Sequence, residues 1–126
     1  MKGQYILVMI LEKDSRIRIG MKGFHNFRKG CYAYVGSALN SIEKRIERHN
    51  RRKKKKHWHI DYFLEKARIV ETKTFRSMVK ENECRLSRKV ERSGGKVIMK
   101  GFGSSDCSCA SHLYFLGDEY CKLLIT

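Results

Sequence analysis

The chain has 126 residues, with 28 Lys and Arg against 13 Asp and Glu, and a formal net charge of +15 at pH 7. This length suits one domain, residues 1–126, with a single core. The longest uncharged apolar run, Tyr5 to Leu11, falls far short of the ~20 residues that a transmembrane helix needs, so no membrane span is expected. No secretory signal is evident, and we expect a cytoplasmic protein.

The positive charge predicts the kind of partner. A small protein with such an excess attracts polyanions, and nucleic acid is the expected partner ahead of an anionic membrane surface. We therefore expect the function to depend on the positive charge.

Apolar and alternating stretches occupy the first third of the chain. They are Tyr5 to Leu11, Arg16 to Ile19 and Cys31 to Val35. The alternation and the apolar runs predict strands of a small antiparallel sheet. The strand pair between Arg16 and Gly30 is interpreted as an insertion.

The period changes after this part of the chain. Asn40 followed by Glu43 is typical of a helix start, and a first helix is expected over about 41–49. A second helix is expected from the i, i+3, i+4, i+7 spacing that begins at Ile60 and ends at Ala67, followed by an extended segment over 69–75.

A third helix and further strands complete the expected order. Val79, Leu86 and Val90 predict the helix, which Gly94-Gly95 would end. A short apolar piece at 97–99 and two strands at 112–116 and 120–125 would follow. The order indicates an α+β fold, a small antiparallel or mixed sheet flanked by helices.

Basic residues concentrate between the first two expected helices. Nine of the 13 residues from Lys44 to Lys56 are Lys or Arg, and the run leads directly into His57-Trp58-His59. A solvated loop is one interpretation. Aromatic rings beside cations favour the other, binding of a nucleic-acid backbone with stacked bases. The residues expected to bind nucleic acid are Gly36, Ser37, Arg48, Arg51, Arg52, Lys53, Lys54, Lys55, Lys56, His57, Trp58 and His59.

Gly36 is included for a different reason. It lies between an expected strand and an expected helix, where a missing Cβ would let the backbone approach a phosphate. An ordinary tight turn is the alternative.

Two helices carry polar groups on their apolar faces. Arg45 and His49 share the stripe that Ile42 and Ile46 define, so they are either anchored inside the protein or aimed at a phosphate. Glu83 lies on the apolar face of the third helix. A carboxylate there is costly unless it is paired, for example with Arg45, or binds a divalent cation such as Mg²⁺.

The five cysteines are an odd number in a chain without an export signal, and no disulfide framework is expected. Cys107, Cys109 and His112 bring three soft ligands together, and Cys84 or Cys121 could add a fourth. Zinc is an alternative here. Structural zinc sites use Cys-x₂₋₄-Cys spacings, so buried free thiols are favoured.

An ordered set of motifs resembles the GIY-YIG nuclease superfamily over nearly the whole chain. The set comprises Gly3-Gln4-Tyr5, Tyr34-Val35-Gly36, Arg45, His49 and Glu83. Four stretches are similar to a largely archaeal branch of that superfamily, one without an assigned function. They are Tyr34 to Ala38, Trp58 to Tyr62, Ser105 to Cys107 and Ser111 to Leu113.

The resemblance implies a metal-dependent phosphodiesterase that cuts DNA, preferred here over RNA. Glu83 would hold Mg²⁺ or another divalent cation such as Mn²⁺. Tyr5 or Tyr34 would deprotonate or orient the attacking water. Arg45 would stabilise charge on the phosphate, and His49 would assist the base or bind the phosphate. The alternative is a non-catalytic nucleic-acid-binding module on the same scaffold.

Overall fold

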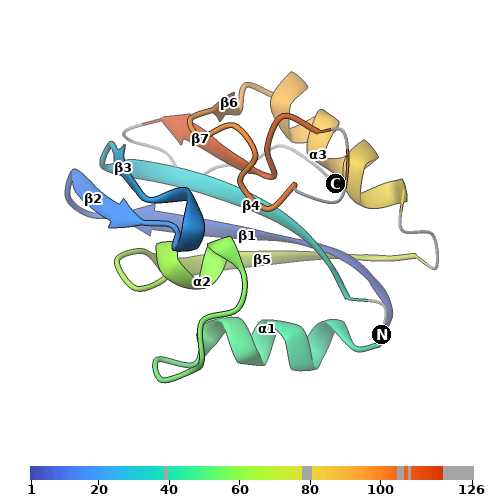
Figure 1. The fold of residues 1–126 in the computed structure, drawn as a ribbon. Coiled ribbons are helices and arrows are strands. Elements are labelled where there is room, and N and C mark those ends of the chain that lie inside the picture. Colours follow the sequence, from blue (N-terminus) through green and yellow to red (C-terminus); the bar gives the residue numbers. More distant parts are fainter. Residues whose placement is uncertain (39, 78–80, 105–106, 108, 118–126) are drawn as a thin grey trace.

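The computed structural model describes residues 1–38, 40–77, 81–104, 107 and 109–117 (Figure 1). Their elements, in chain order, are β1 (Gly3–Leu11), β2 (Ser15–Arg18), the 3₁₀ helix η1 (Gly20–Lys22), β3 (Phe24–Phe27), β4 (Gly30–Ala38), α1 (Ile42–Asn50), α2 (His59–Phe63), β5 (Arg68–Arg76), α3 (Glu81–Arg92), β6 (Lys96–Val97) and β7 (Leu113–Gly117). The expected α+β class is confirmed.

The main sheet has five strands in the order β5-β1-β4-β7-β6, and every neighbouring pair is antiparallel. β1 and β4 pair along their full length, from Gly3 opposite Ala38 to Leu11 opposite Gly30. This register places Tyr5 directly opposite Gly36. β2 and β3 form a separate two-stranded sheet, which confirms the expected strand pair.

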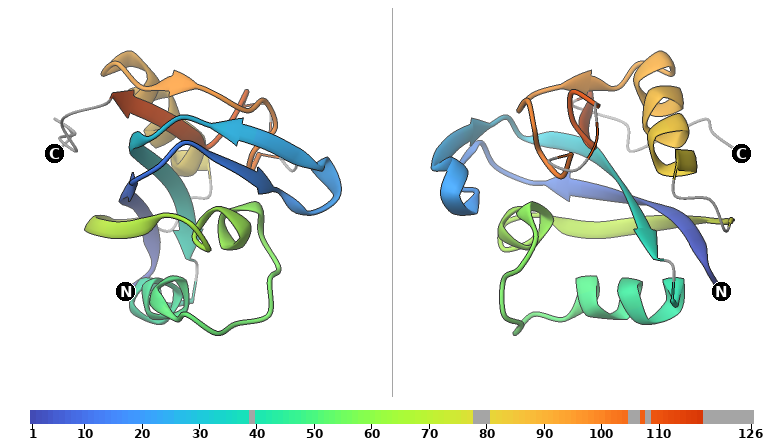
Figure 2. Two further views of the ribbon diagram at one scale, coloured as in Figure 1. Left: turned by 90° about the vertical axis from the view of Figure 1, so that its left-hand side faces the viewer. Right: turned by 45° about the vertical axis from the view of Figure 1, so that its right-hand side comes forward.

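Both faces of the main sheet are covered (Figures 1 and 2). Because side chains alternate along a strand, Tyr5, Leu7 and Met9 of β1 join one core with residues of α1, α2 and the β2–β3 pair. Ile6 and Val8 join a second core with the apolar face of α3. Figure 2 shows α1 and α3 on opposite sides of the strands.

Two element boundaries differ from expectation. α1 is capped by Ser41, not Asn40, because the Ser41 hydroxyl accepts from the Lys44 amide at 3.2 Å. α2 ends at Phe63, before Ala67. Tighter turns after Phe63 lead the chain directly into β5, although Ala67 is buried as its spacing predicted.

Some expectations lie outside the described residues. The strand over 120–125 is one, and the start of the third helix near Val79 is another. In the part of the chain that the structure describes, no helix is long and apolar enough to cross a bilayer.

Candidate functional site

A buried tyrosine–histidine pair lies between β1 and α1. The Tyr5 hydroxyl is 2.7 Å from Nε2 of His49, and the two residues are only 1% and 3% exposed. Gly36 makes the arrangement possible, because a Cβ there would collide with the Tyr5 ring. The His49 ring also packs near those of Tyr34 and Trp58, with centroid distances of 6.4 and 6.0 Å.

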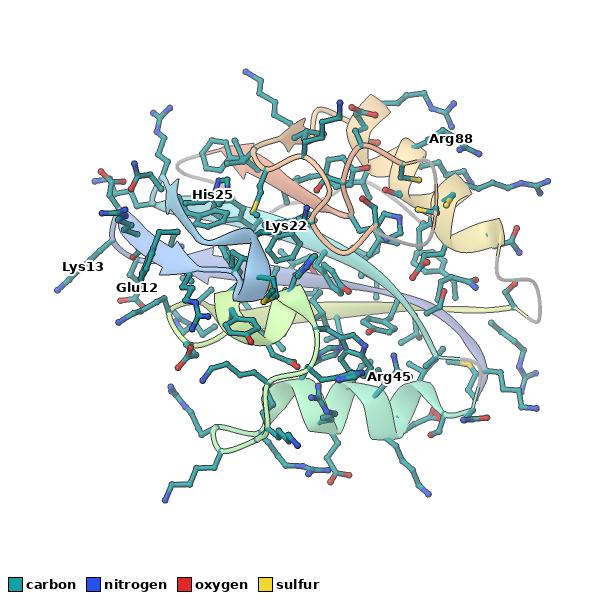
Figure 3. The ribbon with its side chains drawn as sticks, in the orientation of Figure 1. Glu12, Lys13, Lys22, His25, Arg45 and Arg88 are labelled. Atoms are coloured by element: carbon teal, nitrogen blue, oxygen red, sulfur yellow. The ribbon has the colours of Figure 1, made fainter. Side chains whose placement is uncertain are left out.

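Arg45 approaches this pair from α1. Figure 3 shows its side chain rising from the helix towards the sheet. Its Nη1 donates to the Ser37 carbonyl at 3.1 Å, and its Cζ lies 4.4 Å from the centroid of the Trp58 ring. These contacts hold a positive charge beside the two tyrosines, where it opposes the effect of burial on the pKa values of Tyr5 and Tyr34.

Glu83 lies on α3, which packs against the other face of the sheet. Its charge contributes to raising the pKa values of both Tyr5 and Tyr34, and its side chain is 13% exposed. Its Oε2 lies 3.9 Å from Nδ1 of His112. Arg45 binds Ser37 instead, so these contacts do not form the Arg45–Glu83 salt bridge that the structural alternative required.

The incomplete pairing of β4 with β7 in the described part of the chain leaves an open edge of the sheet on the side of α3. Among the described residues, β7 pairs with β4 only from Cys31 to Tyr34. A backbone bond from the Val35 amide to the His112 carbonyl, at 2.9 Å, follows. The last part of β4 therefore has no partner strand on this side within the described ranges, and Glu83 lies near that edge through its 3.9 Å separation from His112.

Burial dominates the electrostatics of the pair. It raises the pKa of Tyr5 well above its ordinary value, more than the nearby Arg45 lowers it. Burial, together with the charge of Lys54, lowers the pKa of His49 to about 3. Near neutral pH the phenol is therefore protonated and the imidazole is neutral. Nδ1 of His49 is buried and has no hydrogen-bond partner among the described residues.

Arg48, expected to bind nucleic acid, is engaged inside the protein. Its two terminal nitrogens each lie 2.9 Å from a different oxygen of Asp61, which is 1% exposed, and Nη2 also donates to the Lys55 carbonyl at 3.0 Å. Asp61 in turn accepts from the His57 and Trp58 amides and so caps α2. Although burial alone would raise it, these bonds lower the pKa of Asp61 to about 2.

Three more of the expected binding residues have internal contacts. Lys54 donates to the His49 and Arg48 carbonyls at 2.7 and 3.2 Å and so satisfies the end of α1. The Trp58 ring has both Arg45 and Arg48 close to it, with the Arg48 Cζ at 4.3 Å. His59 Nδ1 accepts from the Gly103 amide at 2.9 Å. These side chains are half-buried rather than presented to solvent.

The remaining residues of the basic run face solvent. Arg51 is 3.9 Å from Glu47, and the Lys56 Nζ is 3.4 Å from Glu65. The exposed members of the run are Arg51, Arg52, Lys53, Lys55, Lys56 and His57. A pocket of about 280 Å³ beside His49 is bordered by Arg51, Arg52, Lys54 and Lys56.

Gly36 and Ser37 require a correction. Gly36 is buried inside β4 rather than placed after a strand, and its missing Cβ makes room for Tyr5. The Ser37 carbonyl accepts a hydrogen bond from Nη1 of Arg45. The Ser37 hydroxyl is buried without a hydrogen-bond partner in the described part of the chain. The sequence pattern misplaced Gly36 because β4 continues to Ala38.

A second group of side chains lies between α3 and the segment that precedes β7. The ligand atoms of Cys84, Cys107, Cys109 and His112 all lie within 4.8 Å of one another, so this cluster could hold a metal ion. The three cysteines are free thiols, as expected. Burial, and then the neighbouring thiols, raise the pKa of Cys84 to about 12.

The spacing of Cys107, Cys109 and His112 did not match the Cys-x₂₋₄-Cys pattern of structural zinc sites, and it left Cys84 and Cys121 as alternatives for the fourth ligand. Cys84 comes from a distant helix, and only the fold brings it to the other three ligands. Cys31 is disulfide-bonded, which differs from the expectation that the cysteines are free thiols.

The fold and these groups define an α+β domain that carries a buried Tyr–His pair beside Arg45, and a thiol cluster whose His112 lies beside Glu83. The chain belongs to the family described as "Domain of unknown function DUF123", whose model matches residues 4–125. No curated protein and no solved structure matches the chain.

Proposed function

We propose that this protein is a metal-dependent endonuclease of the GIY-YIG type that hydrolyses phosphodiester bonds, with DNA preferred over RNA. The observation that carries the proposal is the 2.7 Å contact between the Tyr5 hydroxyl and His49. The charge of Arg45 lowers the pKa of the same tyrosine, and the charge of Glu83 raises it. A nucleophile-orienting group, a cation and a carboxylate are the groups that phosphodiester hydrolysis needs.

Tyr5 and His49 act on the attacking water in this proposal. The Tyr5 hydroxyl, held by its contact with Nε2 of His49, orients the water, and the proton of the water passes to solvent. The water oxygen forms a bond to phosphorus as the bond to the leaving oxygen breaks, and solvent protonates the leaving group. This step forms neither a tyrosinate at Tyr5 nor an imidazolium at His49, and burial opposes the formation of both.

Arg45 and Glu83 serve the phosphate. Arg45 lies beside the tyrosines, where its guanidinium stabilises negative charge on the non-bridging oxygens. Glu83 suits Mg²⁺ or Mn²⁺, since a hard cation takes one or two carboxylates and completes its shell with water and phosphate oxygen. Such an ion, when bound, supplies Lewis-acid stabilisation of the leaving oxygen.

The exposed part of the basic run holds the nucleic acid. Arg52, Lys53 and Lys55 face solvent close to the end of α1, which also carries Arg45 and His49. Contacts of this kind bind phosphates without reading sequence. The proposal therefore includes salt-sensitive binding to many sequences.

A cleavage assay tests the activity. Supercoiled, branched and single-stranded DNA, and a matched single-stranded RNA, are incubated with the protein in Mg²⁺ or in EDTA. We expect Mg²⁺-dependent products from at least one DNA substrate and fewer from RNA. Identical product levels in Mg²⁺ and in EDTA would contradict the proposal.

A non-catalytic nucleic-acid-binding module is the second candidate. The observation that favours it is the near-complete burial of Tyr5, which makes deprotonation costly. This candidate predicts the same salt-dependent binding of DNA and no products with any divalent cation.

A further inference from the structure

We propose that Cys84, Cys107, Cys109 and His112 bind one zinc ion, which fixes the segment before β7 to α3 and orients Glu83. The zinc assignment is independent of nuclease activity. Only its consequence for Glu83 rests on the proposed function.

The donor set and its spacing suit zinc. A tetrahedral site with Zn–S of about 2.3 Å and Zn–N of about 2.0–2.1 Å requires S···N separations of about 3.5 Å and S···S separations of about 3.8 Å. Cys107 Sγ is 3.5 Å from Nε2 of His112, and all four ligand atoms lie within 4.8 Å of one another. Three thiolates and one imidazole form a closed structural zinc set, whereas Mg²⁺ and Ca²⁺ prefer oxygen ligands.

Hydrogen bonds already hold the two sides of the cluster together. Ser87, one turn after Cys84, donates to the Ser111 carbonyl at 3.1 Å, and the Tyr114 hydroxyl donates to the same oxygen at 2.9 Å. The His112 amide donates to the Phe102 carbonyl at 2.8 Å. These bonds place the ligand-bearing backbone segments against each other, so little rearrangement is needed to bind an ion.

A bound zinc ion would stabilise the segment between β6 and β7. In its described residues it contains no helix or strand, yet His112 is fully buried and Cys107 and Cys109 are partly buried. Arg88 lies on the same helix as Cys84, as Figure 3 shows. Its positive charge acts on Cys109 and complements a Cys₃His zinc centre of net charge −1.

His112 connects this site to Glu83. Its Nε2 faces Cys107, and its Nδ1 lies 3.9 Å from Oε2 of Glu83. A metal at Nε2 requires the proton to be on Nδ1, which then points towards the carboxylate. Histidine ligands in proteins commonly have a carboxylate in this outer position. The zinc ion thus fixes the tautomer of His112 and the orientation of Glu83.

Metal analysis of the full chain tests the proposal. The protein is expressed with zinc in the medium and purified without chelator, and its metal content is measured by mass spectrometry. We expect about one zinc per chain. The zinc content of Cys84→Ser and Cys109→Ser should be lower by a factor of about ten or more, whereas Lys89→Ser, a change at an exposed residue of the same helix as Cys84, should retain the full amount.

A second measurement covers the case in which the cysteine variants fail to fold. Metal-free wild-type protein is titrated with Co²⁺, and we expect thiolate-to-cobalt charge-transfer bands that saturate at one equivalent and disappear when zinc is added. Absence of these bands, together with absence of zinc from the purified protein, would overturn the assignment. Zinc binding without DNA cleavage would leave the zinc site intact and count against the nuclease alone.

Discussion

At the scale of single residues, the chemistry depends on Tyr5. Burial raises its pKa, Arg45 lowers it and Glu83 raises it. Its hydroxyl contacts a histidine that burial keeps neutral near pH 7. Tyr34 is also buried, but its ring packs against Phe102 and His49 rather than forming the 2.7 Å contact. These contacts favour Tyr5 over Tyr34 as the residue that orients the water.

Replacing Tyr5 with Phe tests this assignment. Tyr5→Phe keeps the ring against Gly36 but removes the hydroxyl that contacts His49, so cleavage should fall by about 10²–10⁴-fold while DNA affinity is retained. Tyr32→Phe is the matched control, because its buried hydroxyl donates to the Arg28 carbonyl away from the site. Equal cleavage by the two variants would remove Tyr5 from the mechanism.

His49 also predicts how stability depends on pH. Its pKa is about 3 in the folded protein and 6.5 without perturbation, so the unfolded chain binds more protons between these values. The free energy of unfolding should therefore decrease as the pH falls from 6.5 towards 3, by up to about 1.4 kcal/mol per pH unit from this group. Asp61, whose pKa is lowered from 3.8 to about 2, adds a further loss of stability as the pH falls from about 3.8 to about 2.

Urea denaturation of the wild type and His49→Gln between pH 7 and 4 measures this effect. The substitution should flatten the pH dependence in that range. Parallel curves for the two proteins would show that His49 does not cause it.

At the scale of elements, the junction between α1 and α2 has two separate uses. Arg48 and Lys54 stabilise this junction, since Arg48 binds Asp61 and Lys54 caps the end of α1. Arg52, Lys53 and Lys55 remain exposed. Only the exposed cations should therefore govern the affinity for nucleic acid.

A charge-matched pair of variants tests this division. Replacing Arg51, Arg52, Lys53 and Lys55 with Ser should weaken binding to every DNA sequence and reduce the salt slope by up to about 0.9 for each duplex phosphate that the protein no longer neutralises. The control carries four equivalent changes among exposed cations of the α3 side, at Lys89, Arg92, Lys96 and Lys100. If both variants bind equally well, the run is only a solvated loop.

At the scale of the whole molecule, periodicity was enough to predict the main strands and the three helices. The apolar runs became β1 and β4, the alternating residues became the β2–β3 pair, and the stripes became buried helix faces. Arg45, His49 and Glu83 stood out because polar groups on apolar faces are costly. The structure places His49 against both tyrosines and Arg45 beside them, whereas Glu83 lies on the helix that packs against the other face of the sheet.

The internal partners of the basic run could not be predicted from the sequence. Neighbouring cations look alike in a charge count, but Arg48 meets Asp61 and Lys54 meets the end of α1 only after the chain folds. The complete thiol cluster could not be predicted either, because its fourth ligand, Cys84, lies on a different element from the other three.

Glu83 offers the most direct test of the metal-dependent chemistry. Glu83→Gln keeps the shape of the side chain but removes the charge that suits a divalent cation. Nicking of supercoiled DNA in Mg²⁺ is measured beside DNA affinity and thermal melting in metal-free buffer. We predict loss of Mg²⁺-dependent nicking, with affinity unchanged or higher and a folded protein. A variant that nicks at the wild-type rate per folded molecule would contradict the assignment of Glu83 as the metal ligand.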